Sequence, residues 1–77
     1  MKTINISLNS VDKVKTFVNT ISSLEGDFDL SSNRYVVDAK SIMGIFSLDL
    51  SKPLRLDIHE HSNIDQILDK LSEFIVQ

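Results

Sequence analysis

Cysteine is absent from this 77-residue chain, which also has only two glycines and one proline. Without cysteine the protein has no disulfide framework, thiol nucleophile or thiolate metal site. The glycines, Gly26 and Gly44, are too few for a glycine-rich phosphate-binding loop. No apolar run approaches the roughly 20 residues of a membrane helix, and the first residues lack the continuous apolar stretch of a signal peptide. We therefore expect a cytoplasmic protein that does not bind membranes.

An excess of positive charge is also lacking. Eight Lys and Arg residues against eleven Asp and Glu residues give a formal net charge of −3. Nucleic-acid binding normally depends on clustered Lys and Arg, so we expect no nucleic-acid partner. With 42% apolar and 25% charged residues, the composition is that of a globular protein. A chain this short buries only about 60% of its unfolded surface, which leaves little room for a deep catalytic cavity. We expect one domain over residues 1–77, and not an enzyme.

The spacing of apolar residues predicts seven secondary-structure elements. Alternating apolar and polar residues indicate strands, and apolar residues three and four apart indicate helices. In chain order they are a strand over 3–8, a helix over 11–24, the strands of a hairpin over 27–39 with a turn at 31–33, a helix over 41–48, a strand over 54–59 and a helix over 64–75. Ser10 and Ser41 stand where helix N-caps are expected, and Ser62 precedes Asp65 by three residues, as in a capping box.

The order β-α-β-β-α-β-α favours an α/β (α+β) fold of two layers. Each strand has one apolar face, and the two longer helices are amphipathic. Helices should therefore cover one face of a mostly antiparallel, four-stranded sheet. The other sheet face should be exposed to water, because its positions include Asn5, Asp29, Arg55 and Asp57.

The stretch from Lys40 to Leu48, with Ser41-Ile42-Met43-Gly44 at its start, resembles the HPr family of small phosphocarriers in the bacterial sugar phosphotransferase system. In that family the serine of this stretch is a regulatory site, and a short helix follows it. The element order resembles the family over essentially the whole chain. The resemblance implies an open-faced β-sandwich with three helices.

The phosphocarrier signature of the family is not present at the start of the first helix. Carriers have Gly-x-His-Ala-Arg-Pro there, and an ungapped alignment places Ser10 at the histidine, Asp12 at the arginine and Lys13 at the proline. A serine phosphoester is a much poorer phosphoryl donor than a phosphoimidazole, and the Asp12 carboxylate repels phosphate where arginine would bind it. The resemblance therefore implies a divergent member that has lost histidine phosphocarrier activity, with Ser10 acting as a helix cap.

Members of this kind are similar to Crh-type regulatory paralogues, which lack the histidine, keep the serine and assist a transcription regulator. The resemblance thus implies Ser41 as a phosphorylation site and proteins, such as an HPr kinase or a transcription regulator, as partners. Phosphate would add about −1.5 to −2 charges there. It would lie next to a candidate docking patch of Ile42, Met43, Phe46 and Leu48. The alternative is that Ser41 is only an N-cap and these apolar residues belong to the core and its rim.

The two imidazoles of the chain, His59 and His61, follow Asp57 at spacings of two residues. Three such side chains could converge on a metal ion only if the strand continued through His61 and a fourth ligand arrived. We predict polar surface residues here, and no metal or cofactor. Two further alternatives stay open: a phosphocarrier component that uses one of these histidines, and a degenerate paralogue with an unrelated protein partner.

Overall fold

The protein is described by a computed structural model that covers residues 2–59 and 63–76. Its elements appear in the predicted order, β-α-β-β-α-β-α. They are β1 (Lys2–Ile6), α1 (Val11–Ser22), β2 (Phe28–Ser32), β3 (Tyr35–Asp38), α2 (Ile42–Phe46), β4 (Leu54–Ile58) and α3 (Ile64–Lys70). Within these residues, no helix has the length and apolar character needed to cross a membrane.

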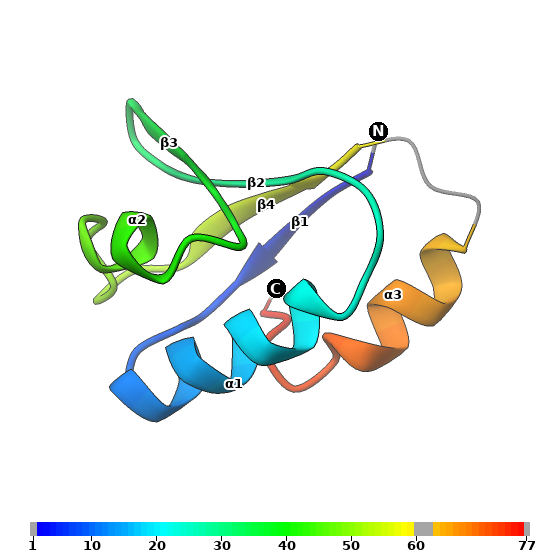
Figure 1. Cartoon of the computed structure of the whole chain (residues 1–77). Coiled ribbons are helices and arrows are strands. Elements are labelled where there is room, and N and C mark those ends of the chain that lie inside the picture. The colour runs from blue at the N-terminus through cyan, green and yellow to red at the C-terminus, as the bar shows by residue number, and fades with distance from the viewer. Residues whose placement is uncertain (1, 60–62, 77) are drawn as a thin grey trace.

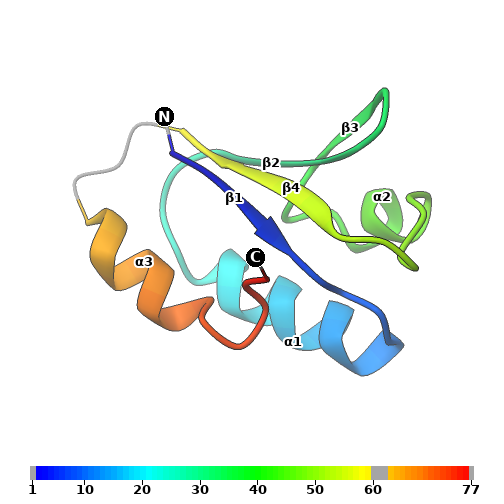
Figure 2. The same ribbon diagram turned by 180° about the vertical axis from the view of Figure 1, so that it is seen from behind.

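The four strands form one antiparallel sheet in the order β1-β4-β2-β3. Helices α1 and α3 lie against one face of the sheet, and none of the helices in the described residues lies on the opposite face (Figures 1 and 2). The short helix α2 lies close to β3 (Figure 1). This is the predicted open-faced α+β sandwich, and the fold class is confirmed.

The core lies between the sheet and its two covering helices. Strand β4 illustrates how the sequence forms this core. Its residues Leu54, Leu56 and Ile58 are buried, while Arg55 and Asp57 between them face the open side of the sheet. Phe17 of α1 packs edge-on against Phe74, with ring centroids 5.4 Å apart and planes at 90°. Buried apolar surface of this kind is the main source of stability in so small a domain.

The hairpin between β2 and β3 turns later than predicted. Ser31 and Ser32 belong to β2, and the turn is made by Asn33 and Arg34. Asn33 has a positive φ of 55°, a conformation that asparagine tolerates better than most residues. The side chain of Tyr35 is 70% exposed, because β3 is a short strand at the edge of the sheet.

The last helix ends earlier than predicted. It stops at Lys70 rather than continuing to residue 75, and the chain then makes turns that bring Ile75 beside Ile6 of β1. The physical reason is that β1 is an edge strand with unpaired backbone groups. Two of them are satisfied here, because the Ser7 N–H donates to the Phe74 carbonyl and the Val76 N–H donates to the Asn5 carbonyl. Asn63 occupies the N-cap position of α3, and Ser62, the predicted cap, lies outside the described residues.

Candidate functional site

The N-terminus of α1 is capped by the side chain of the preceding residue. Ser10 is the N-cap, in an extended conformation, and its Oγ accepts a hydrogen bond from the backbone N–H of Lys13 at 3.1 Å. Asp12 lies exposed in the first turn, where a carboxylate interacts favourably with the helix dipole. The same carboxylate would repel an incoming phosphoryl group. Val11, the apolar residue that begins the helix predicted over 11–24, is 55% exposed in this first turn.

Ser41 caps α2 in the same way. Its Oγ accepts a hydrogen bond from the Gly44 N–H at 3.1 Å, and its own N–H donates to the Asp38 carbonyl at 2.9 Å. The residue is half-buried. Gly44 lies close to β3, since a Cβ added there would approach the Val37 Cβ to 3.1 Å. Helix α2 therefore packs closely against β3 at Gly44, and this contact places the half-buried Ser41 beside the strand.

The apolar side chains of the predicted docking patch divide by burial. Met43 is 78% exposed and Phe46 is 42% exposed, while Ile42 is partly buried. Leu48 is only 7% exposed and belongs to the core, so it does not contribute to an exposed patch. The reason is the short length of α2, which ends at Phe46 and lets the chain turn Leu48 inward. The docking patch, as used below, consists of Ile42, Met43 and Phe46.

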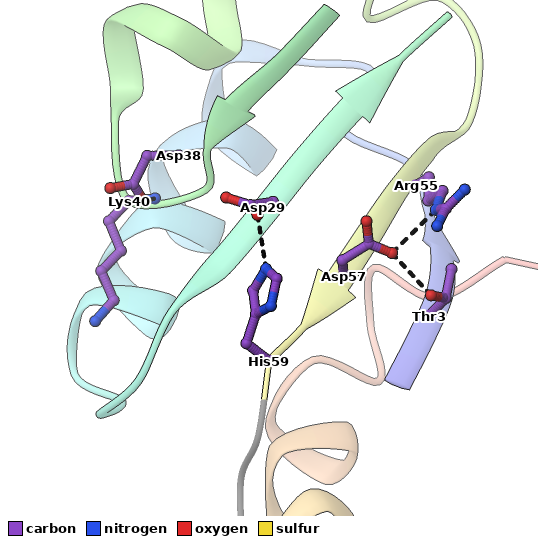
Figure 3. Close-up of polar contacts among 7 residues, drawn as sticks. All are labelled: Thr3, Asp29, Asp38, Lys40, Arg55, Asp57 and His59. Atoms are coloured by element: carbon purple, nitrogen blue, oxygen red, sulfur yellow. Dashed lines mark hydrogen bonds and ion pairs between the residues drawn. The ribbon is translucent and has the colours of Figure 1, made fainter. Parts of the chain in front are cut away.

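Polar side chains gather on the open sheet face (Figure 3). The Oδ1 atom of Asp57 accepts hydrogen bonds from the Thr3 hydroxyl at 2.8 Å and from the Arg55 Nε at 2.9 Å. Burial alone would raise the pKa of Asp57. The two hydrogen bonds, with the charges of Arg55 and His59, outweigh it and hold the pKa of this carboxyl below its usual value.

His59 faces a different partner on the same sheet face. Its Nε2 lies 2.6 Å from the Oδ2 of Asp29, and both side chains are partly exposed. Asp57 and His59 thus turn to separate partners instead of converging on one point (Figure 3). Among residues 2–59 and 63–76, no three His, Cys, Asp or Glu side chains are arranged to hold a metal ion. His61 lies outside the described residues.

The strand register places His59 far from the start of α1. Lys2 of β1 pairs with Ile58, and Ile6 pairs with Leu54. The C-terminal end of β4 therefore lies beside the N-terminal end of β1, and His59 comes directly after it. Ser10 comes after the C-terminal end of β1, at the opposite end of the sheet. A histidine in this position and a helix start at the opposite end of the sheet cannot form one phosphoryl-transfer site.

Two solved structures resemble the chain over nearly its whole length. The crystal structure of HPr-C-His from Thermoanaerobacter tengcongensis is 25% identical, with a TM-score of 0.77, and the match covers 95% of this chain and 89% of that chain. The phosphocarrier protein HPr from Bacillus anthracis str. Ames is 24% identical, with a TM-score of 0.71, and the match covers 97% of this chain and 94% of that chain.

The chain is HPr-like. No protein-family model matches the HPr-like chain, and no curated protein sequence matches it. The similarity to the HPr structures therefore rests on the shared fold and on a sequence identity of about 25%. Sequence reasoning had reached the same family through the stretch that begins at Ser41. It did not identify the exposure of Val11 or the contact between His59 and Asp29, because both depend on where helices and strands end.

Proposed function

We propose that this HPr-like chain is a regulatory, protein-binding module that does not carry phosphate on a histidine at the start of α1. Its fold supports a phosphocarrier-type protein of the sugar phosphotransferase system. The observation that carries the proposal is the start of α1, where Ser10 caps the helix and Asp12 adds negative charge. A carrier needs a nucleophilic imidazole and a cation beside it, and this position has a hydroxyl and a carboxylate instead.

Regulation would act at Ser41. Ser41 is half-buried, its hydroxyl oxygen accepts the capping hydrogen bond from Gly44, and it lies next to the docking patch of Ile42, Met43 and Phe46. A phosphate on Ser41 would add about −1.5 to −2 charges beside these apolar side chains. A partner that buries Met43 and Phe46 would then have to desolvate the phosphate or offer it a cation. Phosphorylation would therefore weaken binding of a partner with a purely apolar surface and favour a partner that places a cation beside the phosphate.

The partner would be a protein that covers the docking patch with apolar side chains. Met43 and Phe46 are well suited to such contact, because Met adapts to irregular surfaces and Phe supplies a large apolar area. A kinase of the HPr type or a transcription regulator fits this description. Neither would need the chain to hold a metal ion or a cofactor.

The chain offers a matched control for testing phosphorylation. Ser10 and Ser41 are both N-caps with a 3.1 Å hydrogen bond from the residue three positions later. We would incubate the wild type, Ser41→Ala and Ser10→Ala with ATP and an HPr kinase, and measure the intact mass. The proposal expects one phosphate on the wild type and on Ser10→Ala, and none on Ser41→Ala.

An unmodified wild type, or a phosphate that persists on Ser41→Ala, would contradict regulation at Ser41. Loss of modification in both variants would show that weakened caps, rather than loss of the acceptor hydroxyl, abolish the reaction. Circular dichroism of each variant would establish that the fold is intact before the comparison is made.

A further inference from the structure

The open sheet face carries a row of like charges across three neighbouring strands. Asp38 of β3 pairs in register with Asp29 of β2, and Asp29 pairs with Asp57 of β4. Neighbouring strands are about 4.8 Å apart, and like charges directly opposite each other destabilise a sheet. Arg55 forms an ion pair with Asp57 only. Arg55 therefore offsets the charge of Asp57, and the like charges that stay directly opposite each other are those of Asp29 and Asp38. Such a pair is more typical of a binding surface than of a structural element.

The nearest lysine does not neutralise this row. Lys40 is two residues from Asp38, but its Nζ donates to the Leu24 carbonyl at 2.8 Å and lies 5.6 Å from the centre of the Phe28 ring. Figure 3 shows the Lys40 side chain directed away from Asp29 and Asp38. In the described part of the chain, neither of these two aspartates has an ion pair with Lys or Arg. His59, whose Nε2 lies 2.6 Å from the Asp29 Oδ2, is the group that faces this row. One imidazole stands against Asp27, Asp29 and Asp38 around the same space, so this part of the face keeps a net negative charge.

A hollow of about 350 Å³ opens beside the row, lined by Asp27, Phe28, Asp29, Asp38 and His59. Three aspartates and one histidine thus line a space with room for a long side chain. Val36, which is 64% exposed, pairs in register with Ser31 and so shares the same sheet face.

We propose that the open sheet face is a second docking surface, occupied by a basic segment of a partner protein. An Arg or Lys side chain would fill the hollow between Asp29 and Asp38, and an apolar neighbour in the segment would contact Val36. Charge complementarity selects a basic segment, and the exposed valine favours a peptide over a free cation. This surface lies on the face of the sheet opposite α1, so the inference does not depend on the proposed function.

The test uses two synthetic peptides of opposite charge. We would titrate ¹⁵N-labelled protein with acetyl-Arg-Leu-Arg-Leu-Arg-amide and with the same peptide carrying Glu in place of Arg, and follow backbone amide shifts by NMR. The inference expects saturable shifts of residues 27–29, 36–38 and 59 with the arginine peptide alone. In the double variant Asp29→Asn, Asp38→Asn the affinity should fall roughly fivefold, because each exposed charge pair contributes modestly.

The control variant is Asp69→Asn, which removes one charge from the exposed surface of α3, on the helical side of the sheet. Its affinity should equal that of the wild type. Absence of saturable shifts, or equal binding by the double variant, would overturn the inference. Spermidine or Mg²⁺ that shifted the same amides at the same concentration would also overturn it, because the occupant would then be a small cation. Asn keeps the acceptor oxygen of Asp, so amide shift dispersion should show both variants folded.

Discussion

Replacing Gly44 with alanine probes the contact that positions α2 and its cap Ser41. A Cβ at Gly44 would lie 3.1 Å from the Val37 Cβ and 3.2 Å from the Ser41 Oγ. Ordinary contacts of this kind begin at about 3.4 Å, so the two groups would have to move apart by about 0.3 Å. The Val37 Cβ is fixed to the backbone of β3 and cannot rotate away. Helix α2 would therefore have to shift, and with it the oxygen that caps the helix.

The expected change in stability follows from two opposing effects. Alanine has the higher helix propensity, which would stabilise the variant by about 0.8–1 kcal/mol. Overpacking a fixed contact typically costs about 1–3 kcal/mol. We therefore expect Gly44→Ala to lower the free energy of unfolding by about 1 kcal/mol, within a range of about 0–2 kcal/mol. Urea denaturation followed by circular dichroism would measure it.

A double-mutant cycle identifies the contact responsible. Val37→Gly removes the opposing atom, so Gly44→Ala should be tolerated better in that background. Val37→Ala keeps the Cβ and is the matched control that should not rescue the variant. If Gly44→Ala instead stabilised the wild type by the full gain in helix propensity, the close packing of α2 on β3 would be refuted.

Five further substitutions test separate parts of the structure. Ser10→Ala and Ser41→Ala each remove an N-cap hydrogen bond and should lower stability by about 1 kcal/mol in urea denaturation. Leu48→Ala should cost about 2–4 kcal/mol in the same assay because Leu48 is buried, whereas Met43→Ala should cost less than about 0.5 kcal/mol. The pKa of Asp57 is lowered in the folded state, so this carboxylate stabilises the protein above its ordinary pKa of 3.8 and loses that effect as the pH falls. Asp57→Asn should therefore be less stable than the wild type at neutral pH, and the difference should vanish in acid-titrated denaturation curves.

Strand and helix positions could be predicted wherever one face of an element is buried. The alternation from Leu54 to Ile58 predicted β4, because every second side chain enters the core. The end of α3 could not be predicted in the same way. Phe74 and Ile75 continue the helical spacing, but their backbone lies along the edge of β1 instead. A long-range pairing of this kind leaves no periodic signal in the local sequence.

The candidate site was predictable in part for the same reason. Both serine caps could be placed, because a hydroxyl before an apolar helical pattern is a local signal. Leu48 was assigned to the surface patch, yet the early end of α2 puts it in the core. The contact between His59 and Asp29 joins residues 30 positions apart, and only the sheet register brings them together.

The most direct test asks whether the chain accepts phosphate from the phosphoenolpyruvate route at all. Wild-type protein would be incubated with phosphoenolpyruvate and the first enzyme of the phosphotransferase system, and its intact mass would be measured before and after brief acid treatment. A histidine-bound phosphoryl group survives base and is lost in acid. Because Ser10 and Asp12 occupy the start of α1, we predict no acid-labile phosphate. A phosphoryl group of this kind mapped to His59 or His61 would contradict the proposal and show that the chain is a carrier.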